Sequence, residues 1–213
     1  MPESANPRVV DHTIAGRWPD AACELLARDP WELTVAAILS ARTSDVQVNK
    51  VMAVLTEHLV GIEAFAAIAP EDLQRLIRRL PLHTAKSRAI VEAARAIVRH
   101  HHGRVPEDLA ALAALPGLGR KTAAVVAGNA FGHPAIAADV HVCRAVQRLG
   151  WATREHPGEA EAALRTRFAP TRWVRLCHQF IRLGRDHCRR QRPLCSTCPL
   201  SATCPRVGVT DAR

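Results

Sequence analysis

Four cysteines near the end of the chain constrain its fold more than any other feature. Cys188, Cys195, Cys198 and Cys204 have the spacing C-x6-C-x2-C-x5-C. Intervals this short allow all four side chains to converge on one metal centre. Four thiolates suit a structural zinc ion as well as an iron–sulfur cluster by ligand type, and disulfides are a third alternative. The sequence therefore predicts a metal-binding loop in this part of the chain.

The segments before these cysteines have the pattern of α-helices. Apolar residues recur every three or four positions, proline and glycine separate the segments, and no sustained alternation indicates strands. The expected helices begin near Pro30, Asp45, Pro70, Ser87, Leu109, Arg120, Val140, Glu159 and Thr171, and Gly61 is expected to end the second. Cys23, Cys143 and Cys177 lie in helical apolar patterns, where we expect buried thiols. The predicted fold class is all-α.

The chain is strongly basic. Lys and Arg number 29 against 20 for Asp and Glu, which gives a formal net charge of +9. This excess favours a polyanion such as DNA as partner, because each neutralised phosphate releases condensed counterions. A basic protein with a merely solvated surface is the alternative. Residues 1–11 lack the apolar run of a signal peptide and no stretch approaches the ~20 apolar residues of a membrane span, so we expect a cytoplasmic protein without membrane contacts.

A tight hairpin between two helices is expected at Leu115–Gly119, with the sequence Leu-Pro-Gly-Leu-Gly. Its two glycines allow a sharp turn and a close approach of the backbone to a ligand. The exposed amide groups, together with the start of the following helix, can hold a DNA phosphate without contacting any base. Taken alone, the same residues are also compatible with an ordinary turn.

The segment Leu115–Ala123 closely resembles the hairpin of the endonuclease III branch of the DNA glycosylases, and Lys121 corresponds to the catalytic lysine of that branch. The segment Ile136–Val142 resembles the family segment that carries the catalytic aspartate, here Asp139. Without the resemblance, Lys121 would be interpreted as a solvated charge and Asp139 as a helix N-cap. The resemblance implies a bifunctional glycosylase and abasic-site lyase that removes oxidised pyrimidines of the thymine glycol type from damaged double-stranded DNA.

The chemistry gives these two residues definite roles. A neutral amine on Lys121 can attack the anomeric carbon of a deoxyribose, expel the damaged base and form a Schiff base, after which the strand is cut by β-elimination. Asp139 can stabilise oxocarbenium character as the base leaves, or position the amine. His141, close to Asp139, is expected to pack or to form local hydrogen bonds.

The cysteine spacing matches the 4Fe-4S loop of the same family, so the resemblance implies that cluster, with all its irons held by protein and a structural role. The first interval contains Arg189, Arg190 and Arg192, which we expect to grip phosphate on a loop fixed at both ends. The alternative is that these arginines only offset the negative charge of a thiolate cluster.

The resemblance covers nearly the whole chain and implies two helical domains flanking a DNA-binding cleft. Residues 23–133 would form a six-helix barrel domain that contains the helix-hairpin-helix motif, at about 109–131. Residues 1–22 and 134–213 would form an iron–sulfur cluster domain. Lys121 and Asp139 would face each other across the cleft, and the protein would act as a monomer.

The expected DNA contacts come from several segments. They are the hairpin residues Leu115, Gly117, Gly119, Arg120 and Thr122, the loop arginines, Arg144, Arg42 and Leu82. Arg42 stands where relatives usually have the glutamine that fills the gap left by the extruded base, and Leu82 aligns with an apolar wedge. We hypothesise that Arg42 donates to the orphaned base and favours guanine through its O6 and N7 atoms. Pro81, His83 and Thr84 replace the more usual Gly, Tyr and Asn, which leaves the lesion range open.

Two other functions are compatible with parts of the sequence. A monofunctional mismatch glycosylase of the same superfamily would use water in place of a lysine, and Lys121 argues against it. A non-catalytic DNA-binding or redox-sensing iron–sulfur protein would keep the hairpin and the cysteines, and the presence of both Lys121 and Asp139 argues against it.

Overall fold

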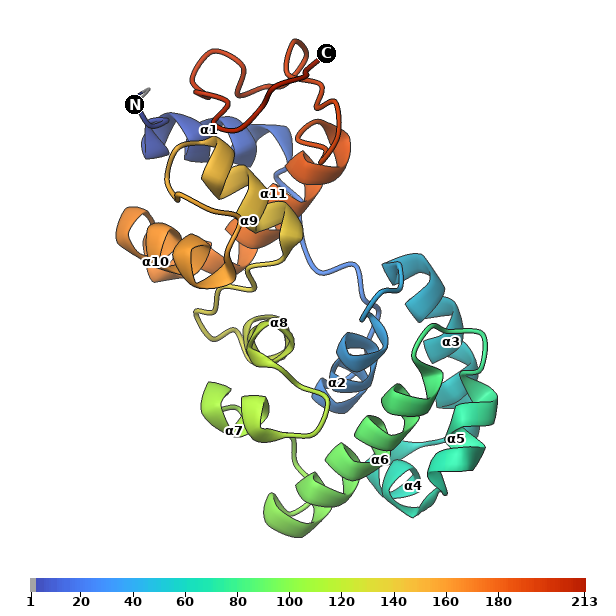
Figure 1. The fold of residues 1–213 in the computed structure, drawn as a ribbon. Helices are drawn as coiled ribbons and strands as arrows, with labels where there is room; N and C mark the ends of the chain where they lie inside the picture. The colour runs from blue at the N-terminus through green and yellow to red at the C-terminus, as the bar shows by residue number, and fades with distance from the viewer. Residues whose placement is uncertain (1–2) are drawn as a thin grey trace. The chain divides into compact units, whose positions relative to one another are not determined.

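A computed structural model describes residues 3–213, which contain eleven α-helices, one 3-10 helix and no β-strand (Figure 1). The helices are α1 (Pro7–Arg17), α2 (Pro30–Leu39), α3 (Asp45–His58), α4 (Gly61–Ala67), α5 (Pro70–Leu76), α6 (His83–His100), α7 (Leu109–Ala114), α8 (Arg120–Ala130), α9 (Val140–Arg148), α10 (Pro157–Arg167), the 3-10 helix η1 (Pro170–Arg172) and α11 (Trp173–Asp186). The prediction of an all-α fold is confirmed. In the described part of the chain, no helix combines the length and the apolar character needed to cross a bilayer.

The chain divides into two compact units. Unit 1 is formed by Met1–Ala22 and Pro134–Arg213, and unit 2 by Cys23–His133. These bounds are those expected of the two domains; that one is a cluster domain and the other a six-helix barrel stays a prediction. Unit 2 contains the seven helices α2 to α8, one more than the sequence pattern indicates, because the short helix α4 carries too few residues for a clear periodicity.

Helix α2 is the central helix of unit 2. All its residues from Trp31 to Leu39 are buried, and it packs against α3, α6 and α8. Its start is fixed by Pro30 at the first turn and by Asp29, whose carboxylate accepts a hydrogen bond from the backbone N–H of Glu32 at 2.8 Å. The long helix α6 packs against α4 and α5 as well as α2, and α7 packs against α8.

Helices α1, α4 and α6 differ most from the sequence-based expectation. Helix α1 was not expected, although Asn6 caps it and Pro7 occupies its first turn. Gly61, with a φ of +75°, starts α4 after α3 has ended at His58, because its backbone conformation redirects the chain between the two helices. Helix α6 begins at His83 and not at Ser87, since Leu82 adopts a left-handed conformation and serves as the N-cap.

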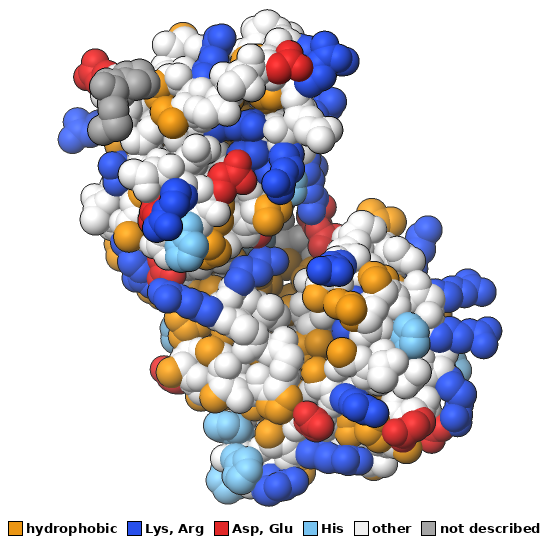
Figure 2. All heavy atoms as spheres, viewed as in Figure 1, with side chains coloured by type: hydrophobic (Ala, Val, Ile, Leu, Met, Phe, Trp, Pro, Cys, Tyr) orange, Lys and Arg blue, Asp and Glu red, His pale blue; other side chains and the backbone are white. Residues whose placement is uncertain are grey.

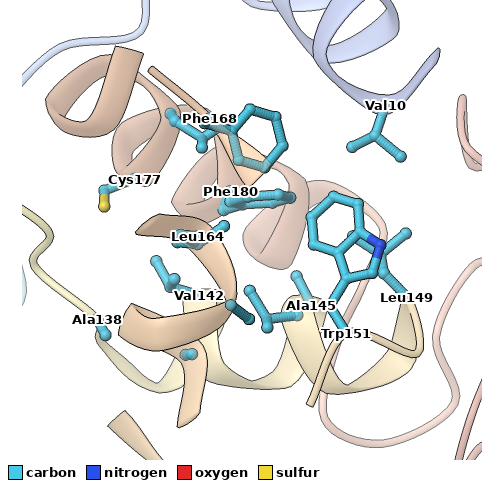
Figure 3. Packing of buried hydrophobic residues seen from close by; sticks show 14 of the residues in the cluster. Val10, Ala138, Val142, Ala145, Leu149, Trp151, Leu164, Phe168, Cys177 and Phe180 are labelled. Carbon is cyan, nitrogen blue, oxygen red and sulfur yellow. The ribbon is translucent and has the colours of Figure 1, made fainter. Parts of the chain in front are cut away.

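The core of unit 1 joins distant parts of the sequence (Figure 3). Helix α9 packs against α10 and α11, and α1 packs against α11. The ring centroid of Trp151 lies 5.6 Å from that of Phe168 and 6.3 Å from that of Phe180. The indole N–H of Trp151 donates to the carbonyl of Ala5 at 2.7 Å, and the N–H of Ala5 donates to the carbonyl of Leu149 at 2.9 Å. These contacts hold the first segment of the chain in the same unit as the cysteine loop.

Candidate functional site

The hairpin in unit 2 is a tight turn between α7 and α8. The N–H of Leu118 donates to the carbonyl of Leu115 at 3.1 Å, and Pro116 and Gly117 occupy the centre of the turn. Gly117 has a φ of +79°, so the residues and the dihedral have the character of a type II turn. A Cβ atom at Gly117 would lie 2.7 Å from the Cβ of Ala89. The turn therefore needs glycine at this position for its own packing.

Gly119 has a different environment from Gly117. It is the N-cap of α8, its φ is −76°, and a Cβ atom there would meet nothing within 4 Å. No side chain caps the start of α8, whereas Asp29, Asp108 and Asp139 accept hydrogen bonds at the starts of α2, α7 and α9. The first N–H groups of a helix have no acceptor within the helix, so the start of α8 has both open space and donors for an anion.

Lys121 is exposed in the first turn of α8, two residues after Gly119. Its amine makes no hydrogen bond and no ion pair with residues 3–213. Arg120, beside it, is also exposed, and Thr122 is half-buried. The predicted nucleophile can thus be reached from solvent next to the open helix start.

Leu115 differs from the expectation of a DNA contact. Its side chain is buried, its N–H donates to the carbonyl of Leu112 at 3.1 Å, and its carbonyl accepts from Leu118. Leu115 therefore stabilises the hairpin from the core of unit 2, and its side chain cannot meet DNA.

Arg42 and Leu82 lie on two other loops of unit 2. Both have a positive φ, +55° and +61°, which is unfavourable for residues other than glycine. Leu82 is 49% exposed, and the exposed Arg42 makes no hydrogen bond or ion pair with any residue of the described chain. Two strained residues thus present a cation and an apolar side chain to solvent.

Asp139 is the N-cap of α9 in unit 1. Its Oδ1 atom accepts hydrogen bonds from the backbone N–H groups of His141 at 2.8 Å and Val142 at 2.9 Å. The capping role is therefore real, and it fixes the orientation of the carboxylate. The Oδ2 atom accepts no hydrogen bond from residues 3–213, so one oxygen of a half-buried carboxylate is available for chemistry.

His141 and Arg144 are internal residues of unit 1. Arg144 is 4% exposed, and its guanidinium donates to the carbonyl of Cys188 at 2.7 Å and to Nδ1 of His141 at 3.0 Å. The prediction that Arg144 contacts phosphate is wrong, because its donors satisfy groups inside the unit. Burial lowers the pKa of His141, and the prediction of local packing for this residue is confirmed: Gly184 lies so close that a Cβ there would be 2.5 Å from the His141 ring.

The four cysteines at the end of the chain line one cavity of unit 1. Its lining includes Cys188, Cys195, Cys198, Cys204, Arg148 and His187, together with apolar side chains of the loop. Burial, together with the neighbouring thiols, raises the pKa of Cys198 to about 11. Within residues 3–213, no three His, Cys, Asp or Glu side chains are placed to hold a single metal ion. The cavity nonetheless gathers all four predicted ligands.

Arg148 and His187 complete the surroundings of these thiols. The Arg148 guanidinium donates to Sγ of Cys188 at 3.4 Å and to the carbonyls of Arg189 and Arg190 at 2.7 and 3.1 Å. Nδ1 of His187 is buried without a hydrogen-bond partner in the described chain. Donors directed at sulfur stabilise thiolates and cluster sulfides, so the residues of this cavity fit an iron–sulfur cluster.

The loop arginines are on the surface. Arg189, Arg190 and Arg192 are exposed, and Arg192 pairs with Asp211 at 3.3 Å in an exposed ion pair of little energetic weight. Figure 2 shows Lys and Arg side chains spread over the visible faces of both units and not confined to one patch. The loop therefore offers cations to an anionic partner, in contrast to the buried Arg144.

The remaining cysteines divide into two kinds. Cys143 and Cys177 are buried as predicted, and burial raises the pKa of Cys143 to about 11 and that of Cys177 to about 12. Cys23 is half-buried in an irregular segment, which differs from the expected helix. Burial raises the pKa of the Cys23 thiol, and the nearby charge of Lys121 acts in the opposite direction.

Each unit thus collects part of the predicted site. Unit 2 contains the hairpin, Lys121, Arg42 and Leu82, whereas unit 1 contains Asp139 and the cysteine loop. That Lys121 and Asp139 face each other stays a prediction. Arg148, which supports the loop, was not expected from the sequence, although Arg144 and Arg148 lie four positions apart on a helix whose other inward residues are apolar.

Comparisons with known proteins identify the family of the chain. Residues 35–170 match the model of the HhH-GPD superfamily base excision DNA repair proteins. Endonuclease III of Bacillus subtilis is 39% identical over 194 residues, which are 90% of this chain and 88% of that protein. A non-covalent endonuclease III–DNA complex superposes with a TM-score of 0.89 at 39% identity, covering 93% of this chain and 94% of the other.

A second structure is a trapped endonuclease III–DNA covalent intermediate, an estranged-adenine complex. It superposes with a TM-score of 0.89 at 38% identity, covering 94% of this chain and 96% of the other. Sequence identity of this size over nearly the full length of both proteins shows membership of the same family and not only a similar fold. The chain belongs to the endonuclease III family, within the HhH-GPD superfamily of base excision DNA repair proteins.

Proposed function

We propose that the protein removes oxidised pyrimidines of the thymine glycol type from duplex DNA and cleaves the strand through a Schiff base on Lys121. The broader activity, DNA glycosylase with abasic-site lyase, follows from membership of the endonuclease III family. The observation that carries the proposal is the exposed Lys121 in the first turn of a helix whose start is open and uncapped. A relative trapped as a covalent DNA intermediate supports a covalent step of this kind.

The proposed reaction begins at C1′ of the damaged nucleotide. The neutral amine of Lys121 forms a bond to C1′, the glycosidic bond breaks, and the base leaves with the bonding electrons and takes up a proton. The amine then loses a proton and the sugar ring opens, which gives an iminium ion between Nζ and C1′. Loss of a proton from C2′ breaks the bond between C3′ and O3′ and thus cuts the strand.

Asp139 would stabilise positive charge at the sugar as the base leaves. Its Oδ1 atom is held by two backbone N–H groups of α9, which fixes the side chain and leaves Oδ2 to act. Asp139 belongs to unit 1 and Lys121 to unit 2.

Cys188, Cys195, Cys198 and Cys204 would hold a 4Fe-4S cluster. When bound, the cluster would join both ends of the loop by four iron–thiolate bonds. Arg148 would donate to the first of these thiolates while it satisfies two loop carbonyls. The backbone of the loop would then be fixed, and its arginines Arg189, Arg190 and Arg192 would bind DNA phosphates.

The DNA partner would be a damaged duplex bound by a monomer in the cytoplasm, at the nucleoid. The glycine amides of the hairpin, with Arg120 and Thr122, would hold a phosphate at the start of α8. Leu82 would enter the base stack, and Arg42 would donate to the base opposite the lesion, with a preference for guanine.

Borohydride trapping tests the proposal, because the reagent reduces a Schiff base irreversibly. The purified protein is incubated with duplexes that contain thymine glycol or an abasic site, and adducts are separated on a denaturing gel. The chain has only three lysines, Lys50, Lys86 and Lys121, so the adduct is simple to assign. The variant Lys121→Ala is compared with Lys50→Ala, which removes an exposed lysine of α3.

We expect an adduct with both duplexes in the wild type and in Lys50→Ala, and none in Lys121→Ala. Base release without strand cleavage would contradict the lysine mechanism and favour a glycosylase that uses water. Tight binding with an intact cluster but neither base release nor adduct would favour a non-catalytic DNA-binding protein.

A further inference from the structure

One buried lysine connects the two loops of unit 2 that contain Arg42 and Leu82, both of which have a positive φ. Lys86 is 4% exposed, and its Nζ atom donates to Oγ1 of Thr43 at 2.9 Å. Lys86 is the fourth residue of α6, the helix that begins directly after Leu82, and Thr43 directly follows Arg42. A residue 43 positions away in sequence is thus held next to the strained backbone of Arg42.

Thr43 forms a second hydrogen bond within its own loop. Its hydroxyl donates to the carbonyl of Ala41 at 3.2 Å while it accepts from Lys86. The chain of hydrogen bonds therefore connects Lys86 to the residues on both sides of Arg42. A positive φ in a residue other than glycine persists only where its surroundings enforce it, and this connection provides such an enforcement.

Lys86 also fixes the second loop. Its backbone N–H donates to the carbonyl of Leu82 at 2.9 Å, which closes the first turn of α6 onto the residue with the left-handed conformation. The side chain of Lys86 thus holds the Arg42 loop and its backbone holds Leu82. Any movement of one loop relative to the other has to displace the same residue.

A lysine is an unfavourable choice at this position if only packing is required. Burial lowers the pKa of Lys86 because the charged form loses its hydration. A methionine has a similar length and would fill the space without this penalty. What the ammonium group adds is a directed bond to the Arg42 loop.

We propose that Lys86 is a positioning residue that fixes Arg42 and Leu82 relative to each other, so that both can enter the duplex while the damaged nucleotide is extruded. The inference rests on the proposed function, because it requires Arg42 and Leu82 to meet the DNA. Because Lys86 is buried, we expect it to contact neither the DNA nor the reacting atoms. Its effect is confined to substrates in which a nucleotide must leave a base-paired duplex.

The test uses the full-length protein and separates extrusion from chemistry. Lys86→Met removes the donor, Thr43→Val removes the acceptor, and Thr43→Ser keeps the hydroxyl as a matched control. Lys50→Met controls for the loss of a lysine at an exposed site of α3. Single-turnover rates are measured for thymine glycol opposite guanine or adenine in a duplex, and for an abasic site in a single-stranded oligonucleotide.

Lys86→Met and Thr43→Val are expected to slow base excision from the duplex about 10- to 100-fold, since a small misplacement of a positioning group has effects of this size. The double variant should lose no more than either single variant, because both remove the same bond. The preference for the opposite base should weaken, and cleavage of the single-stranded substrate should be unchanged. Thr43→Ser and Lys50→Met should behave as the wild type.

Unchanged excision from the duplex in both Lys86→Met and Thr43→Val would overturn the inference. An equal loss on duplex and single-stranded substrates would also overturn it, because it would indicate a general structural defect. Thr43 is only half-buried, so Thr43→Val carries the test if Lys86→Met does not fold. A wild-type protein that forms no borohydride adduct would instead refute the proposed lysine chemistry.

Discussion

The two glycines of the hairpin predict opposite phenotypes for the same substitution. Gly117→Ala places a methyl group 2.7 Å from the Cβ of Ala89 and imposes a φ of +79° on alanine. The left-handed conformation costs about 1–2 kcal/mol, and the overlap with a packed neighbour costs about 1–3 kcal/mol. Gly119→Ala meets no atom within 4 Å at an ordinary φ of −76°, so we expect a change in stability within about 1 kcal/mol.

These costs become measurable shifts in thermal unfolding. A loss of about 2–5 kcal/mol in Gly117→Ala corresponds to a Tm lower by about 4–20 °C for a protein of this size. Gly119→Ala should keep the wild-type Tm but place its methyl group where the phosphate would approach the start of α8. If the methyl group of Gly119→Ala prevents one hydrogen bond between a backbone N–H and the phosphate, the loss of about 1.5–3 kcal/mol would weaken DNA binding about 10- to 100-fold.

Circular dichroism melting and fluorescence anisotropy, with a duplex containing a stable abasic-site analogue, measure the two effects separately. A wild-type Tm in Gly117→Ala would contradict the first prediction, because the contact with Ala89 would then have no effect on stability. Wild-type affinity in Gly119→Ala would equally refute the assignment of a phosphate to the start of α8. Arg120, the adjacent cation, is unchanged in both variants.

Three further outcomes are expected. Arg144→Met should leave the salt dependence of DNA binding unchanged but speed the loss of the absorbance of the cluster. Arg190→Ala should reduce the slope of the logarithm of the binding constant against the logarithm of the salt concentration by the contribution of about one phosphate. A lower salt dependence in Arg144→Met would contradict its internal role. Burial lowers the pKa of His141 from 6.5, so the contribution of its neutral form to the stability of the fold is complete above pH 6.5. The free energy of unfolding should fall as the pH drops from 6.5 towards the lowered pKa, and His141→Asn should weaken this pH dependence in melting experiments. Because burial raises the pKa of the Cys143 and Cys177 thiols to about 11 and about 12, neither should be alkylated by iodoacetamide at pH 8 in the native protein, and mass spectrometry of labelled peptides checks this.

The sequence indicated the elements whose signals are local. Pro30 at the first turn of α2 and Pro70 at that of α5 marked helix starts, and the structure agrees. The start of α1 carried the same kind of signal, Asn6 followed by Pro7, but its weak apolar periodicity hid the helix. Helix α4 is too short for periodicity to be visible.

The error at Arg144 has another physical origin. Its side chain is directed inward because the irregular loop after Cys188 contains carbonyl groups that need donors, and Arg144 and Arg148 supply them. The partners are more than 40 positions away in sequence, so no local pattern distinguishes these arginines from cations that face DNA. The same applies to Lys86 in α6, whose partner Thr43 lies on the loop between α2 and α3.

The burial of these cations changes what the net charge of +9 means for DNA binding. Arg144 and Arg148 are turned towards carbonyls of the cysteine loop, and Arg172 forms an ion pair with Asp11 at 2.6 Å. Charges of this kind contribute to the long-range field but cannot replace counterions on a phosphate. The salt dependence of binding should therefore reflect the exposed cations alone, at the start of α8, at Arg42 and on the cysteine loop. A basic composition predicts an anionic partner, but the internal hydrogen bonds decide how many of its cations can reach that partner.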